Sequence, residues 1–222
     1  MQEKSVETNS RSVVRRVLPG IFLLLVSWII VDVNLRPKHS LREFDPVVVA
    51  RLDGAMWRSY YERKPLKLLG QLAELIRSQY GAPFWQSWLL AGYAGRAAFV
   101  FKDGHSRADY ARALPHLRNF YTGINQLADN GFDVEKVTNM ELEWWVIRRE
   151  KPRFSPADWE RILAAEAAEF YHLPAQNFQE HARLRVSAML LRDSLGNNIT
   201  ERDWQRIRVL LEQSWRALRV VV

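Results

Sequence analysis

The segment from Val17 to Leu35 is the most apolar part of the chain, and it limits what the rest can do. Its sequence is VLPGIFLLLVSWIIVDVNL, and no charged residue occurs between Val17 and Val31. A helix needs about 20 mostly apolar residues to cross the hydrocarbon core of a bilayer, so the run is just long enough. We therefore predict a transmembrane helix over residues 17–35, preceded by a polar and basic tail over residues 1–16.

Two other interpretations of this run stay open. Its strongly apolar core, from Ile21 to Val31, has a length that also occurs in signal peptides and in buried helices of soluble proteins. A cleaved signal peptide needs small residues at its cleavage site, and only Val31 and Val33 resemble an Ala-x-Ala pattern. A buried soluble helix is disfavoured because a basic, proline-containing segment, residues 36–38, follows at once. We prefer the uncleaved anchor.

Basic residues flank the apolar run on both sides, with Arg11, Arg15 and Arg16 before it and Arg36, Lys38 and Arg42 after it. The positive-inside rule therefore gives almost no preference for either orientation. A short basic tail before an apolar core and a long domain is typical of a signal anchor, which predicts an extracytoplasmic domain. Near the far end of the run we expect the carboxylate of Asp32 to reach the membrane interface. The alternative is a buried charge that pairs with a partner helix.

Composition limits the rest of the protein to one globular domain. About 185 of the 222 residues follow the apolar run, and we divide them into a connector, 36–44, and a domain, 45–222. The chain has no cysteine, which excludes disulfides, thiolate metal sites and a cysteine nucleophile. The formal charge of +7 is spread thinly, so we expect no nucleic-acid partner and instead a basic surface that faces solvent or anionic head groups.

The pattern of the domain is helical throughout. Apolar residues recur at helical spacing, and no stretch alternates with a period of two, so we predict an all-α fold. Capping residues and prolines mark about eight helices, which start near residues 45, 65, 83, 106, 133, 155, 174 and 200. We expect Pro115 to kink or divide the fourth of them. Short connections between the helices predict a compact bundle.

Two of the predicted helices show a clear buried face. In the helix that starts near residue 45 we place Val48, Leu52, Met56 and Tyr60 on one face. In the helix that starts near residue 174 we expect the inward side chains to be Phe178, Ala182, Val186 and Met189. Both sets follow the three-to-four residue spacing of an amphipathic helix.

The helix predicted over residues 83–101 is rich in tryptophan and in small residues, namely Ala91, Gly92, Ala94, Gly95, Ala97 and Ala98. Such small residues allow a neighbouring helix to pack closely, and they also raise the possibility that this helix touches lipid. The polar Gln86, Ser87 and Arg96 favour a soluble core. The chain has nine tryptophans, and any that is exposed would indicate a face that contacts a partner or a membrane.

Two groups of residues are candidates for a binding site. The first lies on the helix after Asp133 and consists of Glu141, Trp144, Trp145 and Arg148. In a pocket wall, Arg148 would hold an anion and Glu141 would act as acid or base. We favour a structural role, with Trp144 in the core, Arg148 stacked on it, and Glu141 paired with an arginine from another helix.

The second group is Lys102, His105 and Arg107, around a turn in which Ser106 is the expected N-cap of the next helix. Free amides at a helix start, next to basic side chains, can bind a phosphate or carboxylate. Capping alone also explains the turn.

No catalytic motif, nucleotide fingerprint or metal-ligand pattern is complete in this chain, so we predict no cofactor and no metal. We therefore expect a membrane-anchored helical binding or accessory protein that contacts lipid through residues 17–35 and acts through protein partners in a membrane complex. The alternative is a helical enzyme or ligand carrier with an anion-binding internal pocket. A closed, dry core would argue against this alternative, whereas polar groups converging in a deep pocket would favour it.

Overall fold

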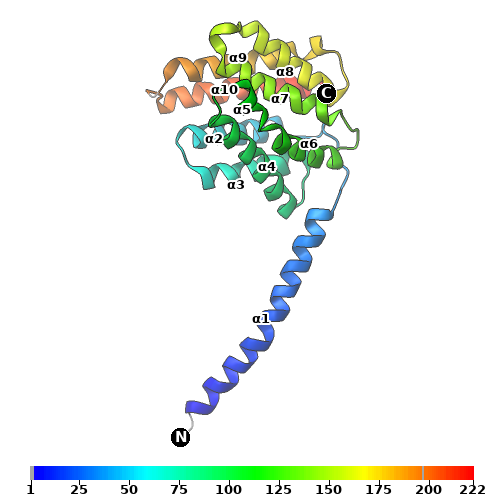
Figure 1. Cartoon of the computed structure of the whole chain (residues 1–222), viewed down its shortest axis with the longest axis vertical. Helices are drawn as coiled ribbons and strands as arrows, with labels where there is room; N and C mark the ends of the chain where they lie inside the picture. Colours follow the sequence, from blue (N-terminus) through cyan, green and yellow to red (C-terminus); the bar gives the residue numbers. More distant parts are fainter. Residues whose placement is uncertain (1–2, 197) are drawn as a thin grey trace.

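The computed structural model describes residues 3–196 and 198–222, and within these ranges the chain is all-α. One long helix, α1 (Glu3–Asn34), projects from a helical bundle (Figure 1). The bundle contains α2 (Pro46–Tyr61), α3 (Pro65–Tyr80), α4 (Phe84–Lys102), α5 (Arg107–Ala111), α6 (Leu114–Leu127), α7 (Val134–Arg149), α8 (Pro156–Tyr171), α9 (Gln179–Leu195) and α10 (Glu201–Val221). Two short 3₁₀ helices, Lys151–Arg153 and Ala175–Phe178, complete it. The predicted all-α fold is confirmed.

The apolar part of α1 stays outside the bundle. Its window Val17–Asn34 has a mean hydropathy of 2.1, and only 6% of it is buried in the rest of the protein. Length and composition therefore suffice for a membrane span. The helix also extends upstream to Glu3, so residues 3–16 of the predicted tail and the apolar run belong to one continuous helix.

The helices begin where their capping residues predict. The side chain of Asp45 accepts hydrogen bonds from the amides of Val47 and Val48, and Ser155 and Thr200 each form a capping box. Pro115 divides the fourth predicted helix: α5 ends at Ala111 and α6 begins at Leu114. For this reason the described bundle has nine helices where we expected about eight.

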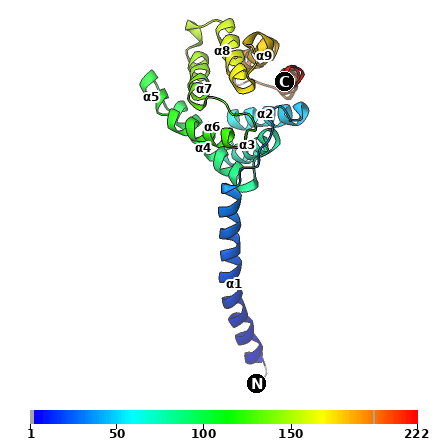
Figure 2. The ribbon, with the colours of Figure 1, turned by 90° about the vertical axis from the view of Figure 1, so that its right-hand side faces the viewer.

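The larger helices form a closed ring of neighbours. Each of α2, α3, α4, α6, α7, α8, α9 and α10 packs against the next, and α10 returns to pack against α2. Figure 2 shows α7 and α8 above α3, α4 and α6, with α9 near the C-terminus. Short connections keep consecutive helices next to each other. A ring of this kind encloses a central space.

One predicted buried face is correct and the other is displaced. Phe178, Ala182, Val186 and Met189 are all buried, as expected. On α2, however, the fully buried positions include Val49 and Asp53, whereas Tyr60 is exposed. The face is rotated toward Asp53 because this carboxylate has partners on α9 and α10, which hydropathy alone does not reveal.

The connector between α1 and α2 is attached to the bundle. His39 forms a backbone bridge with the end of α6: its amide donates to the carbonyl of Leu127 at 2.8 Å, and its own carbonyl accepts from the amide of Asp129 at 3.0 Å. The ammonium of Lys38 donates to the carbonyl of Ala128 at 2.9 Å. Leu41, further along, is buried in the core. The connector is therefore a packed segment that fixes where α1 leaves the bundle.

The end of α1 also contacts the start of α4. Asp32 is only 6% exposed, and its Oδ1 accepts the backbone amides of Trp85 at 2.7 Å and Gln86 at 3.0 Å. The ring of Trp28 stacks on Phe84, with centroids 6.2 Å apart, and meets Trp85 edge-on. We expected the Asp32 carboxylate to reach an interface, and it is instead buried as the cap of another helix.

Candidate functional site

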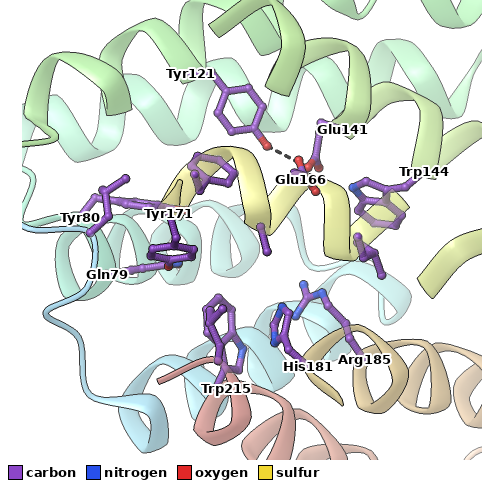
Figure 3. Close-up of a pocket in the computed structure, with 15 residues that line it drawn as sticks. Gln79, Tyr80, Tyr121, Glu141, Trp144, Glu166, Tyr171, His181, Arg185 and Trp215 are labelled. Atoms are coloured by element: carbon purple, nitrogen blue, oxygen red, sulfur yellow. Dashed lines mark hydrogen bonds between the residues drawn. The ribbon is translucent and has the colours of Figure 1, made fainter. Parts of the chain in front are cut away.

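A partly open cavity of about 160 Å³ lies among the helices of the ring (Figure 3). It is lined by Leu41, Gln79, Tyr80, Tyr121, Glu141, Trp144, Leu163, Glu166, Ala167, Phe170, Tyr171, His181, Arg185, Trp215 and Leu218. These residues come from the connector and from α3, α6, α7, α8, α9 and α10. The aromatic walls and converging polar groups are the features expected of a ligand site.

Two carboxyl groups meet at one side of the cavity. Tyr121 donates its hydroxyl to Glu141 Oε2 at 2.8 Å (Figure 3). Trp145 donates its indole N–H to Glu141 Oε1 at 2.7 Å. The side chain of Glu166 is hydrogen-bonded to that of Glu141. Two ionised carboxylates only accept hydrogen bonds, so one of the pair must carry a proton.

Glu166 is the protonated member of this pair. Burial, followed by the nearby charge of Glu141, raises the pKa of Glu166 well above its usual range. The raised pKa favours a proton on Glu166 in its hydrogen bond with Glu141. The arrangement places one negative charge, shared by three donors, at this side of the cavity.

A buried ion pair lies at another side of the cavity. Arg185 donates to Asp53 Oδ2 at 2.6 Å, and the indole N–H of Trp215 donates to the same oxygen at 2.9 Å. Asp53 is 1% exposed, and it joins α2 to α9 and α10. Because the carboxylate of Asp53 balances the guanidinium, Arg185 contributes little net charge to the cavity.

The other titratable groups of the cavity are neutral. Burial lowers the pKa of His181 to about 4, and Nδ1 of its ring lies 3.0 Å from the carbonyl of Ser214. Burial also raises the pKa of Tyr80 and Tyr171 above the usual range of a phenol. These side chains present hydroxyl and imidazole groups without charge.

Two lining residues each have a buried polar atom without a hydrogen-bond partner in the described part of the chain. These atoms are Oε1 of Glu166 and Nε1 of Trp144. The carboxyl oxygen of Glu166 can accept a hydrogen bond, and the indole N–H of Trp144 can donate one. A buried polar atom left unpaired costs about 1–3 kcal/mol. Both atoms can therefore pair with a molecule that offers complementary groups.

The first predicted group is divided by the structure. Glu141 and Trp144 line the cavity, and Trp145 lies behind Glu141 as its hydrogen-bond donor. Arg148 lies outside the cavity, where it donates to the Tyr61 hydroxyl at 2.6 Å and to Asp193 at 2.9 Å. Glu141 is bonded by a tyrosine and a tryptophan where we expected an arginine.

The second predicted group lies away from the cavity, on the surface. Lys102, His105 and Arg107 are exposed around the start of α5, and Arg107 pairs with Glu143 at 2.8 Å. Ser106 caps this short helix, as predicted. Across the described residues, no three His, Cys, Asp or Glu side chains are grouped so that they could hold a metal ion.

Sequence analysis missed the residues that complete the cavity, chiefly Glu166, His181 and Arg185. A signal was present for Glu166, which lies at helical spacing from Trp159 and Leu163 on the apolar face of α8. His181 and Arg185 are one turn apart on α9, next to buried alanine and valine. Their burial depends on partners from other helices, which periodicity does not identify.

The fold and the site together define an all-α protein with one N-terminal helix long and apolar enough to span a membrane, and with a polar cavity inside a ring of helices. The chain matches no protein-family model, no curated protein and no solved structure. Its function is therefore inferred from the geometry of the cavity and of α1.

Proposed function

We propose that this protein is a single-pass membrane protein whose helical domain binds a small polar molecule in the central cavity. The observation that carries the proposal is the pair of unpartnered buried atoms, Glu166 Oε1 and Trp144 Nε1, among the described lining residues. A ligand that offers one donor and one acceptor would pair both atoms. Such convergent polar groups in an aromatic pocket are the usual basis for ligand specificity.

The charge balance of the cavity favours an uncharged ligand. The carboxylate of Glu141 is already held by Tyr121, Trp145 and the proton of Glu166. The guanidinium of Arg185 is neutralised by a buried carboxylate. A charged ligand would find no free counter-charge here, so a neutral molecule fits better than the anion of the alternative that the sequence left open.

The volume and the aromatic walls of the cavity narrow the choice of ligand further. A cavity of about 150 Å³ in another protein holds benzene, and the cavity here, at about 160 Å³, suits a single six-membered ring. Trp144, Phe170 and Trp215 provide aromatic surfaces against which a planar ring can stack. The proposed ligand class is a small planar amide or nitrogen heterocycle.

Ligand binding is tested on the full chain in detergent, by saturation-transfer NMR with 2-pyridone, uracil and benzamide as probes. Ala167→Leu places a larger side chain in the cavity and is expected to abolish binding. Ala165→Leu is the matched control, because Ala165 is half-buried on the same helix and does not line the cavity. Both variants must first unfold at a temperature close to that of the unaltered chain. The proposal fails if no probe binds, or if both variants bind equally well.

The membrane anchor rests on the exposure of α1. A core helix of a soluble protein is mostly buried, whereas 6% of the apolar window is buried here. Cleavage after residue 31 or residue 33 would separate Trp28 from its contacts on α4, which supports an uncleaved helix. Carbonate extraction of native membranes and mass spectrometry of the mature chain test both points. Reporter fusions at the two termini test whether the domain is extracytoplasmic, as the signal-anchor pattern predicts.

A protein partner in the membrane is the second candidate function. Its support is that α1 exposes large apolar side chains along the span, among them Leu23, Leu24 and Val31, which a partner helix could cover as well as lipid. Gentle solubilisation followed by purification of the full chain tests this role. Recovery of monomer alone, without any co-purifying protein, would contradict it.

A further inference from the structure

The two exposed tryptophans of the described chain both lie where α1 meets α4. Trp28 is 51% exposed and Trp88 is 37% exposed, and each is close to Phe84, with ring centroids 6.2 and 6.5 Å away respectively. Phe84 and Leu89 are exposed as well. Tryptophan is enriched at membrane–water interfaces because its ring is apolar and its N–H is polar.

The position of this contact along α1 determines its depth in a bilayer. Helix α1 rises about 1.5 Å per residue, so Trp28 lies about 9 Å below Asn34, the end of the apolar window. The whole window Val17–Asn34 is about 27 Å long, close to the roughly 30 Å of the hydrocarbon core. A bilayer that uses the whole window therefore extends past the level of Trp28.

If the bilayer ended below the level of Trp28, the remaining apolar part of α1 would be too short to span it. The part of the window below Trp28, from Val17 to Ser27, rises only about 16 Å, which is half of the hydrocarbon thickness. Moving the span toward the N-terminus would place Arg15 and Arg16 in the hydrocarbon, where each arginine costs about 2.5–3.5 kcal/mol near the centre. Thinning of the bilayer and snorkelling recover only part of this difference.

We propose that the first turns of α4, with Phe84, Trp88 and Leu89, rest together with Trp28 in the head-group and upper acyl region of the membrane. This inference rests on the proposed membrane anchor and adds a second contact, made by the domain itself. The guanidinium of Arg77 lies 5.5 Å from the ring centre of Phe84, where it can meet lipid phosphate. Interfacial surfaces of this kind enter a bilayer by about 5–10 Å, which agrees with the depth of Trp28.

The burial of Asp32 follows from this placement. A carboxylate at this depth would be costly in lipid, and the free amides at the start of α4 surround it instead. The same contact prevents the domain from lifting off the membrane without breaking the cap. The contact between α1 and α4 therefore limits how the ring of helices can be oriented relative to the bilayer.

The chain has no cysteine, so single nitroxide labels can be introduced into the full protein in phosphatidylcholine–phosphatidylglycerol vesicles. Labels replace Trp88, Leu89, Phe99 and Leu25, one at a time. Phe99 is the matched control, because it is 50% exposed on the same helix and lies about 16 Å further along the helix axis than Trp88. Depth is measured by power saturation, as the ratio of accessibility to oxygen and to a water-soluble nickel reagent.

We expect this ratio to be severalfold higher at positions 88 and 89 than at position 99, and highest at position 25. A water-like ratio at both 88 and 89, with position 25 in lipid, would overturn the inference and leave the anchor intact. A water-like ratio at position 25 would overturn the anchor and the inference together. Leu89→Cys provides an independent measurement if Trp88→Cys disturbs the fold.

Discussion

The carboxylate of Asp32 accepts the backbone N–H of Trp85 at 2.7 Å, so the end of α1 caps the start of α4. The residue before α4 is Pro83, which supplies no side-chain cap of its own. A cap that is distant in the sequence therefore replaces a local one. The bond makes the apolar helix and the domain a continuous unit.

Replacing Asp32 should weaken this junction. Asp32→Ala leaves two amides of α4 unpaired and is expected to lower the free energy of unfolding by about 0.5–2 kcal/mol. Asp32→Asn keeps an acceptor oxygen and should lose less. Denaturant unfolding of the full chain in micelles measures both. Asn34→Ala is the control, since Asn34 is exposed and bonds only to its own helix; an equal loss from that variant would contradict the capping role.

Replacing Asp53 should be far more damaging. Asp53→Ala leaves the guanidinium of Arg185 buried without a counter-charge, and breaking a buried pair in this way costs about 3–5 kcal/mol. Glu143→Ala removes the exposed partner of Arg107 and should change the free energy of unfolding by less than about 1 kcal/mol. Comparable losses in the two variants, measured by chemical denaturation, would show that Asp53 does not hold the ring together.

Glu166 should make stability fall as the pH rises. Its folded pKa lies above its unfolded value near 4.5, so its stabilising contribution is complete below that pH. The contribution is lost as the pH rises toward the folded pKa, at no more than about 1.4 kcal/mol per pH unit. Glu166→Gln cannot ionise, so its stability relative to the unaltered chain should increase between about pH 5 and pH 8.

Comparing Glu166→Gln with the unaltered chain also removes the effect of His181 on stability. Its lowered pKa makes stability fall as the pH drops from 6.5 toward about 4, and this occurs equally with either residue at position 166. The difference between their free energies of unfolding therefore reports Glu166 alone. A pH-independent difference would mean that Glu166 is ionised in the folded protein throughout this range.

Gly123 should not tolerate a side chain. A Cβ at this position of α6 would lie 2.2 Å from Cδ2 of Leu90, which is buried, so Gly123→Ala is expected to cost about 1–3 kcal/mol. Gly92→Ala is the matched control on α4, because a Cβ there meets nothing within 4 Å. That variant should be stabilised by roughly 0.5–1 kcal/mol, since alanine favours a helix. Thermal unfolding distinguishes the destabilisation expected of Gly123→Ala from the stabilisation expected of Gly92→Ala.

This pair of glycines also shows how far the small residues of α4 could be interpreted from the sequence. We expected them to admit a neighbouring helix, and Ala91 and Ala97 are indeed fully buried. Gly92 and Gly95, in contrast, face open space, and the closest approach is at Gly123 on the neighbouring helix. Composition indicates that a close contact exists, but it does not indicate which helix supplies the glycine.

Local chemistry alone determined the all-α fold, most helix starts and the apolar character of α1, because caps, prolines and periodicity act within a few residues of the chain. The tertiary structure alone decided which polar side chains are buried. Asp53 and Arg185 lie on different helices, and their burial is tolerated because each balances the charge of the other. Hydrogen bonds between distant segments leave no periodic pattern in the sequence. Only the tertiary structure therefore identified the cavity and the Asp32 cap.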